Sequence, residues 1–287
     1  MAKPKHKAVK AYKNLEFLSS PDARVIRLIS EFLEPARRFR HEGIRDTIVF
    51  FGSARVLPRT TALARLNDIT KNVEKVRRKT PKAISRLEGA KMDLQMSHYY
   101  DDAVKLSRML TNWSMRLVQP NRFVISSGGG PGIMEAANRG AKMAGGRSVG
   151  LNISLPFEQS SNPYIPDELI FEFHYFFMRK LWFVYLSKAM IMFPGGFGTF
   201  DETFEVLTLL QTKKLKKKVT VVLYGSEYWK NTINFENLVR LRLINPEDLK
   251  IFRFADTPEE AFDHVVGELR KNYPTETLER RKSGLKH

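Results

Sequence analysis

Short apolar runs alternate with longer amphipathic stretches along most of this chain. Apolar runs of this length are typical of strands buried on both faces, and strands that alternate with helices indicate a parallel sheet. The runs that we predict as strands are Thr47–Phe51, Arg122–Ile125, Val149–Ile153, Leu169–Phe173, Ala189–Phe193, Val219–Tyr224 and Ile251–Phe254. The pattern therefore predicts an α/β fold, a doubly wound, Rossmann-like parallel sheet with helices on both faces.

Two regions outside this strand pattern have helical periodicity. Residues from about Pro21 to Ala36 carry an apolar stripe at helical spacing. Residues from about 60 to 117 contain Pro81 as their only proline, which predicts two or three long helices inserted before the second strand. We therefore divide the chain into a basic tail with an N-terminal helix (1–45), a Rossmann-like nucleotide-binding domain that carries the insertion (46–275) and a basic C-terminal tail (276–287).

Two glycine-rich turns carry the clearest functional signal. Ser126–Glu135 and Pro194–Glu202 each follow an apolar run and open a predicted helix. Glycine lets bare backbone amides approach a ligand at the positive end of a helix dipole, which is how proteins hold phosphate without a metal. Gly52–Arg55 is a third turn of this kind. A lone turn is compatible with simple architecture, but three turns at one edge of a parallel sheet predict a single nucleotide crevice.

Composition narrows the class of protein. The chain has 287 residues, of which 43% are hydrophobic, so it is long enough for a sizeable core. Cysteine is absent, which excludes disulfides and thiolate chemistry. No run approaches the roughly 18 apolar residues of a membrane span, and no secretory signal is recognisable at the start. We expect a soluble, cytoplasmic protein without membrane contact.

The formal net charge of +17 has two interpretations. Much of the charge lies in the two tails and in the block Lys213–Lys218. None of these segments has the interleaved aromatic residues of a single-strand groove or a recognisable recognition helix. We expect a solvated basic surface, and nonspecific binding of polyanions by the tails is the less favoured alternative.

Motifs for other chemistries are absent from the sequence. It contains no Walker loop, no nucleophile elbow and no His-Glu-x-x-His zinc motif, and its six histidines are scattered. We therefore expect neither a metal nor a cofactor.

Three motifs together resemble the LOG family. They are Gly128–Ala137, Met178–Lys180 and Pro194–Glu202, which follow the family's order within residues 47–224. Members of this family are cytokinin riboside 5′-monophosphate phosphoribohydrolases, formerly labelled as lysine decarboxylases, and the chain is similar to the long bacterial members. The resemblance implies hydrolysis of the N-glycosidic bond of an AMP-type nucleotide, AMP or a cytokinin riboside monophosphate, to free base and ribose 5-phosphate. The long additions to the chain favour AMP.

The resemblance and the residue chemistry point to two catalytic candidates. Cleavage of a base–ribose bond passes through an oxocarbenium-like cation, which a nearby carboxylate such as Glu202 stabilises. The spacing of Thr199 and Glu202 is equally that of a capping box, in which Thr199 caps the helix, and the family match favours catalysis. Arg179 offers a planar donor fork for phosphate, ribose or the departing base, with a surface salt bridge as the alternative.

The remaining candidates concern substrate binding. We expect Glu205 to contact the ribose or to neighbour Glu202, and Lys180 is either a second phosphate contact or a solvated neighbour. Backbone amides and two hydroxyls are expected to bind the nucleotide, at Gly129, Gly130, Gly132, Gly195, Gly196, Gly198, Thr199 and Ser53.

Two functions from different classes follow. The first is the phosphoribohydrolase, and the alternative is a non-catalytic nucleotide carrier or sensor that uses the same glycine cradle. Aromatic and apolar residues are dense between Phe171 and Tyr185, more than one strand and one helix normally bury. With the resemblance, this predicts a homodimer or a higher homo-oligomer.

Overall fold

A seven-stranded sheet forms the centre of the protein, in the order β4-β3-β2-β1-β5-β6-β7. The computed structural model describes residues 8–75, 80–118, 123–155, 160–273 and 275, so most of the predicted C-terminal tail and residues 1–7 lie outside the described part. Every neighbouring pair of strands is parallel. The strands are β1 (Thr47–Phe51), β2 (Val124–Ser127), β3 (Ser148–Ile153), β4 (Ile170–Phe173), β5 (Ser187–Met192), β6 (Thr220–Tyr224) and β7 (Phe252–Ala255).

This strand order confirms the predicted doubly wound α/β fold. The chain begins the sheet at β1, extends it to β4 on one side, and then returns to place β5 on the other side of β1. All the predicted strands occur, with small shifts at their ends. The largest differences are that β2 lies two residues later than predicted, at Val124–Ser127, and that β5 starts at Ser187; Leu169 ends a 3₁₀ turn, η3 (Asp167–Leu169). Arg122, the first residue of one predicted strand, lies outside the described residues.

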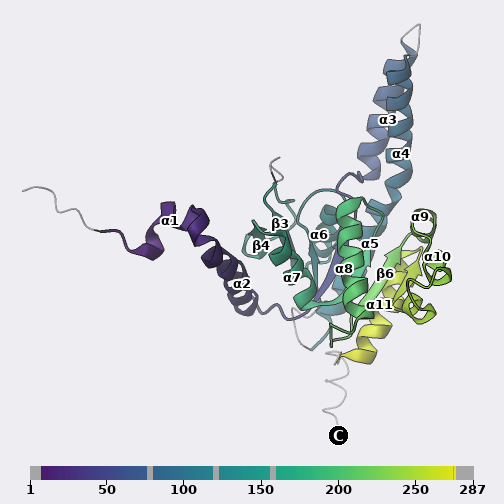
Figure 1. Ribbon diagram of the computed structural model, residues 1–287. Coiled ribbons are helices and arrows are strands. Elements are labelled where there is room, and N and C mark those ends of the chain that lie inside the picture. The colour runs from purple at the N-terminus through teal and green to yellow at the C-terminus, as the bar shows by residue number, and fades with distance from the viewer. Residues whose placement is uncertain (1–7, 76–79, 119–122, 156–159, 274, 276–287) are drawn as a thin grey trace, which may run out of the picture.

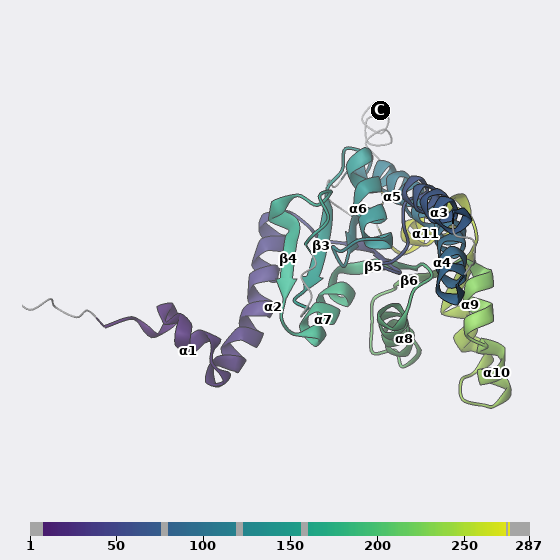
Figure 2. The ribbon, with the colours of Figure 1, turned by 90° about the horizontal axis from the view of Figure 1, so that it is seen from above.

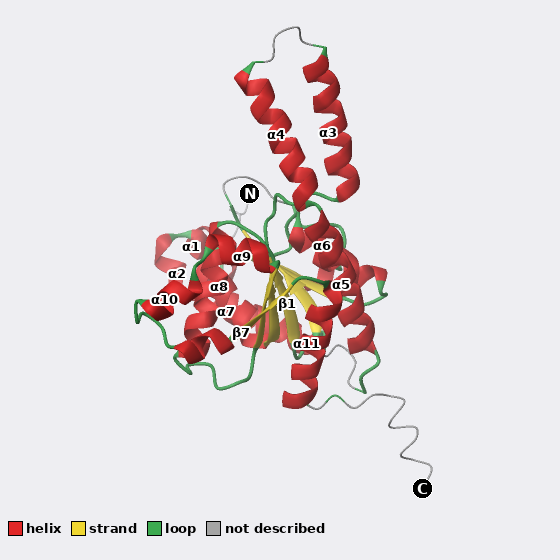
Figure 3. Ribbon diagram, turned by 90° about the vertical axis from the view of Figure 1, so that its right-hand side faces the viewer, coloured by secondary structure: helices red, strands yellow, loops and turns green. Residues whose placement is uncertain are grey.

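Helices cover both faces of the sheet, as Figures 2 and 3 show. Strand β1 is buried along its whole length, and its side chains alternate between the two layers. Ile48 and Phe50 pack in one apolar cluster, and Val49 and Phe51 pack in the other. The first cluster includes side chains of α5 (His98–Met115), α6 (Ile133–Met143) and α11 (Pro258–Asn272), and the second those of α2 (Arg24–His41), α7 (Phe176–Leu186) and α8 (Phe197–Gln211).

The region from about 60 to 117 forms three helices, within the range of two or three that the sequence predicted. Of these, α5 packs on the sheet, whereas α3 (Arg59–Glu74) and α4 (Pro81–Met96) form a hairpin that projects from the body (Figures 1 and 3). The hairpin has a small apolar cluster of its own, around Ile69, Val73 and Ala90. Thr80 caps α4 by accepting a hydrogen bond from the amide of Ala83.

The predicted helix over 21–36 is displaced. Residues Pro21–Ala23 form a 3₁₀ turn, η2, and α2 continues through Pro35 to His41. Polar contacts hold α2 against the edge of the fold: the carboxylate of Glu31 accepts from the amides of His174 and Tyr175, and the indole N–H of Trp182 donates to the Glu31 carbonyl. In the added part of the helix, Arg38 donates to the Ile170 carbonyl at 2.6 Å and Phe39 packs in the second apolar cluster, so tertiary contacts beyond the reach of local propensity accompany the extension.

The remaining elements are short. They are η1 (Ala11–Lys13), α1 (Leu15–Ser19), α9 (Ser226–Thr232), α10 (Phe235–Arg240) and η4 (Pro246–Lys250). None of the helices in the described ranges combines the length and the apolar character that crossing a membrane requires.

Candidate active site

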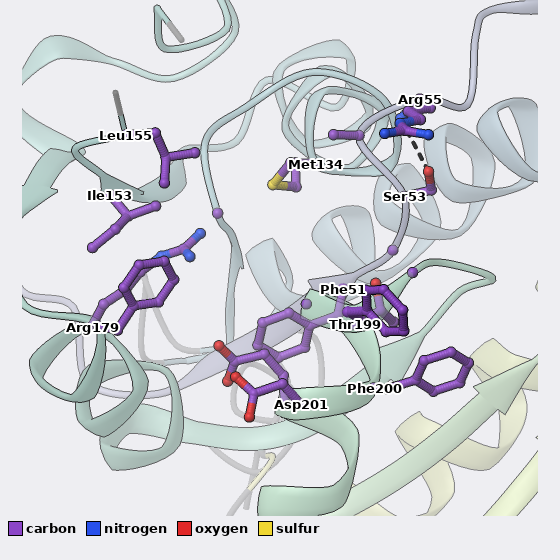
Figure 4. A pocket seen from close by; sticks show the side chains of 18 of the residues that line it. Phe51, Ser53, Arg55, Met134, Ile153, Leu155, Arg179, Thr199, Phe200 and Asp201 are labelled. Carbon is purple, nitrogen blue, oxygen red and sulfur yellow. Dashed lines mark hydrogen bonds between the residues drawn. The ribbon is translucent and has the colours of Figure 1, made fainter. Parts of the chain in front are cut away.

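A cavity of about 640 Å³ opens at the carboxyl ends of β1 and β5. These two strands are where the order of the sheet reverses, which is the position at which doubly wound sheets bind ligands. The walls come from the turn after β1, the turns before α6 and α8, the end of β3 and the start of α7. Figure 4 shows Arg179, Ile153 and Leu155 on one side of this cavity, and Ser53, Arg55 and Thr199 on the other.

Backbone hydrogen bonds tie the three predicted turns together at Ser53. The Ser53 amide donates to the carbonyl of Pro194 at 3.0 Å, and the Ser53 carbonyl accepts from the amide of Ile133 at 3.1 Å. The Ser53 hydroxyl accepts from the amide of Arg55 at 3.1 Å. The turn after β1 is therefore the link between the two glycine turns, and the convergence that the sequence predicted is observed.

The second glycine turn presents an open helix start. Helix α8 begins at Phe197 with Gly196 as its N-cap, and no side chain caps it. The first amides of a helix have no acceptor within the helix, so the amides of Phe197 and Gly198 stay available. The Phe197 side chain is 93% exposed beside them. Glycine is required at 195, because a Cβ there would collide with the hydroxyl of Thr199.

The first glycine turn is closed by its own neighbours. The amide of Gly129 donates to the Ser127 hydroxyl at 3.1 Å. The side-chain amide of Asn162 donates to the carbonyls of Gly129 and Gly130 and to the side chain of Asn138. The first amide of α6 is occupied by the Ser53 carbonyl. This turn is therefore a packed support of the cavity, although α6, like α8, starts without a side-chain cap.

Arg179 lies deep in the cavity wall. Its Nε donates to the Leu151 carbonyl at 2.7 Å, and its guanidinium lies 5.1 Å from the centroid of the Phe183 ring. A Cβ at Gly128 would collide with the guanidinium, so glycine at 128 provides the space for it. Burial lowers the pKa of Arg179 from its usual value, and the negative charge of Glu202 opposes that shift. With Nε committed to the backbone, the guanidinium is held in one orientation beside the cavity.

Glu202 lines the cavity from within α8 and is only 6% exposed. Burial raises the pKa of Glu202 to about 7, and the positive charges of Lys180 and Arg179 oppose that rise. A carboxyl group with such a pKa exchanges a proton near neutral pH, as a general acid or base requires. The capping-box interpretation of Glu202 is wrong, because α8 starts at Phe197 and Thr199 lies inside the helix.

Lys180 lies between two carboxylates of α8. Its Nζ is 2.7 Å from Asp201 and 3.0 Å from Glu205. Burial acts to lower the pKa of Lys180, but its hydrogen bonds to both carboxylates hold that pKa above its usual value. These two ion pairs join α7 to α8, and the negative charge of Glu205 also acts to raise the pKa of Glu202.

The structure gathers half of the predicted site residues on the cavity wall. Those that line it are Ser53, Arg179, Gly196, Gly198, Thr199 and Glu202. Those behind the wall or beside it are Gly129, Gly130, Gly132, Gly195, Lys180 and Glu205. Gly195 lines an adjoining cavity of about 190 Å³ that shares Ser53 and Arg55 with the first. The roles predicted for all of these residues stay predictions.

Several residues near the site were not found from the sequence. Asn152, Met134 and Phe176 line the cavity, and Asn162 braces the first glycine turn. The conformation of Gly129, with φ +76°, brings its backbone against the Asn152 side chain, where a Cβ has no space. A lone asparagine has no local signature, since its partners lie far away in the sequence. No group of histidine, cysteine and carboxylate side chains in the described part of the chain is suited to hold a metal ion.

Comparisons with known proteins agree with this picture. A family model described as possible lysine decarboxylase matches residues 134–265. A probable cytokinin riboside 5′-monophosphate phosphoribohydrolase of rice, Oryza sativa subsp. japonica, is 26% identical over 170 residues, and the match covers 58% of this chain and 64% of that protein. The cytokinin riboside 5′-monophosphate phosphoribohydrolase of Rhodococcoides fascians is 29% identical over 161 residues, covering 55% of this chain and 75% of that protein.

A solved structure of the molybdenum cofactor carrier protein from Chlamydomonas reinhardtii is 16% identical, covers 79% of this chain and 99% of that chain, and has a TM-score of 0.43. A likeness at this score carries no weight for the function of the chain. The family model and the two relatives, by contrast, confirm the resemblance to the LOG family that the three sequence motifs indicated.

Proposed function

We propose that the protein hydrolyses the N-glycosidic bond of adenosine 5′-monophosphate-type nucleotides, with AMP as its substrate, to adenine and ribose 5-phosphate. The observation that carries this proposal is Glu202, a buried carboxyl group with a pKa near 7 in the cavity that the open start of α8 also lines. A phosphate site next to an acid–base group is what a phosphoribohydrolase needs. The names of the two relatives support the same reaction class.

The phosphate binds at the start of α8 in this proposal. The free amides of Phe197 and Gly198 donate to it, and the helix dipole favours its negative charge. The side chain of a helical residue leans toward the helix start, so Glu202 reaches back toward the bound nucleotide. The sugar then lies between the phosphate site and the carboxylate.

Glu202 and Arg179 act on the reacting end of the nucleotide. The oxygen of a water molecule bonds to C1′ while the bond from C1′ to the base nitrogen breaks. The carboxylate of Glu202 stabilises the cationic sugar and takes a proton from the attacking water, and that proton then passes to the departing base, so that one water molecule is consumed. Arg179, already oriented by Leu151, supplies donors to the nucleotide.

The 5′-phosphate provides the sharpest test of this proposal. AMP should release adenine, whereas adenosine should react about a hundredfold more slowly or not at all, because the binding energy of the remote phosphate holds the ribose against Glu202. The two substrates are compared at equal concentration by chromatography of the released base. Tight binding of AMP with no adenine formed would favour the carrier, and equal rates for both substrates would refute the phosphate site.

We further propose that the protein is a homodimer. Helix α7 exposes Phe176, Phe177 and Tyr185, each more than half exposed, and Phe176 also lines the cavity. Exposed apolar patches of this kind mark protein interfaces. Sedimentation analysis of the native protein and of Phe177→Glu tests this, since the substitution should yield monomers if α7 lies in the interface.

A further inference from the structure

A second cavity, of about 950 Å³, lies at the opposite end of the sheet from the candidate active site. It is bounded by the segment that follows α8, by the amino ends of β6 and β7, and by the last turn of α11. Strand β7 is the edge of the described sheet, next to β6. A volume of this size is within the usual range for small-molecule sites.

The wall of this basic cavity is strongly positive. The cationic side chains that line it are Lys213, Lys216, Lys217, Lys218, Lys250, Arg253 and Lys271. Glu268 is the only carboxylate among the lining residues. Burial and then the nearby charge of Arg253 lower the pKa of His264. Burial and then the charge of Lys188 lower the pKa of Lys217 to about 7, so Lys217 contributes only part of a charge.

Among the described residues, most of these cations have no carboxylate partner. Lys271 pairs with Glu268 at 3.6 Å, and Lys217 donates to the carbonyls of Val184 and Tyr185 at the end of α7. For Lys216, Lys218 and Arg253, by contrast, no ion pair with another described residue is observed. Lys213 follows the end of α8 and Lys271 lies in the last turn of α11, so attraction to a helix C-terminus accounts for these two cations. It does not account for Lys216, Lys218 and Arg253.

We propose that this basic cavity binds a chain of condensed phosphates, an oligophosphate anion. Each phosphate group carries between one and two negative charges, so about three linked groups would balance the excess of lining cations. The cations come from four separate elements and converge on a hollow, which suits a compact anion. A nucleic acid would instead need phosphate contacts spread along an extended face. This site is independent of the proposed function.

The test is a calorimetric titration of the full chain with inorganic triphosphate. We expect saturable binding that is tighter than that of orthophosphate, and a loss of affinity of about tenfold or more in the triple variant Lys216→Gln/Lys218→Gln/Arg253→Gln. A matched control, Lys71→Gln/Lys82→Gln/Lys91→Gln on the projecting hairpin, removes the same charge from a distant surface. Its affinity should stay within about twofold of the native value.

Further arms of the experiment separate the sources of binding. Thr199→Val alters the nucleotide cavity and should leave the affinity for triphosphate unchanged. If Thr199→Val weakens triphosphate binding and the triple variant does not, the anion binds in the nucleotide cavity and the proposal is wrong. Equal losses in the triple variant and the hairpin control would reduce the effect to overall charge. Tighter binding of a short duplex DNA than of triphosphate, lost in the same triple variant, would replace the oligophosphate with nucleic acid. Adenine release by the triple variant, measured without triphosphate, tests the proposed function separately.

Discussion

The two glycine turns look alike in sequence and differ in the folded protein. Residues 128–132 and 194–198 both connect a buried strand to a helix. The first turn has its amide and carbonyl groups bound by Ser127, Asn162 and Ser53. Neither helix start has a side-chain cap, but the start of α8 lines the cavity over Gly196, Phe197, Gly198 and Thr199, whereas the first turn contributes Gly128 and Met134.

This difference separates architecture from ligand binding. A turn whose polar groups are already satisfied gains little from a phosphate, because the ligand would have to displace existing hydrogen bonds. A turn with orphan amides gains the full set of new bonds. We therefore propose that the second turn binds the phosphate, whereas the first turn leaves space at Gly128 for the Arg179 guanidinium.

The largest expected effect concerns the carboxyl group that the second turn adjoins. Glu202→Gln should lower the turnover of AMP by about 10²- to 10⁴-fold, because it removes the charge that faces the sugar cation. AMP affinity, measured by calorimetry, should change only a few-fold, since the phosphate site is untouched. Asp201→Asn, on the same helix, is the matched control. Full activity in Glu202→Gln would refute the catalytic role.

A pair of substitutions tests the contrast between the turns directly. Asn162→Ala should destabilise the protein by about 1–3 kcal/mol, because the buried Gly130 carbonyl loses its side-chain donor, and the Gly129 carbonyl and Asn138 each lose one of their two donors. A methyl group at position 196 has open space, so Gly196→Ala should change the free energy of unfolding by less than about 1 kcal/mol. The same substitution should weaken AMP binding. Urea denaturation and AMP titration measure both effects. The reverse result, a stable Asn162→Ala and an unfolded Gly196→Ala, would exchange the roles of the turns.

The raised pKa of Glu202 also predicts a pH-dependent stability effect. The unfolded chain releases this proton near pH 4.5 and the folded chain near pH 7, so ionisation of Glu202 destabilises the fold as the pH rises through this window. At about pH 8, Glu202→Gln should therefore be more stable than the native protein, on the order of 2 kcal/mol, and the gain should shrink toward about pH 5. Denaturation at both pH values measures it. A gain that is equal at both would mean that ionisation is not its cause.

The smallest expected effect concerns the terminal charges. Removal of residues 1–15 and 278–287 should leave adenine release from AMP within about twofold, because the cavity contains none of these residues. Binding of the full chain to mixed polyanions should fall steeply with salt. A strong loss of turnover in the truncated protein would give the tails a part in the reaction.

Much of the fold could be predicted from local signals in the sequence. The alternation of apolar runs with helical stretches predicted the parallel sheet, since burial on two faces requires a continuous apolar strand. The three turns were predicted to meet, because carboxyl ends of parallel strands share an edge. The projection of α3 and α4 was not predicted, because a helical pattern does not tell which helix packs on the sheet.

The sequence by itself determined the strand–glycine–helix units and the placement of Glu202 on the helix after the second turn, because periodicity and glycine spacing act within a few residues. Only the tertiary structure decided which turn is open. Asn162 lies 33 residues from Gly129 and closes the first turn across that distance. The burial that raises the pKa of Glu202 likewise comes from packing between distant segments, and desolvation is a property of the folded surroundings rather than of neighbours in the chain.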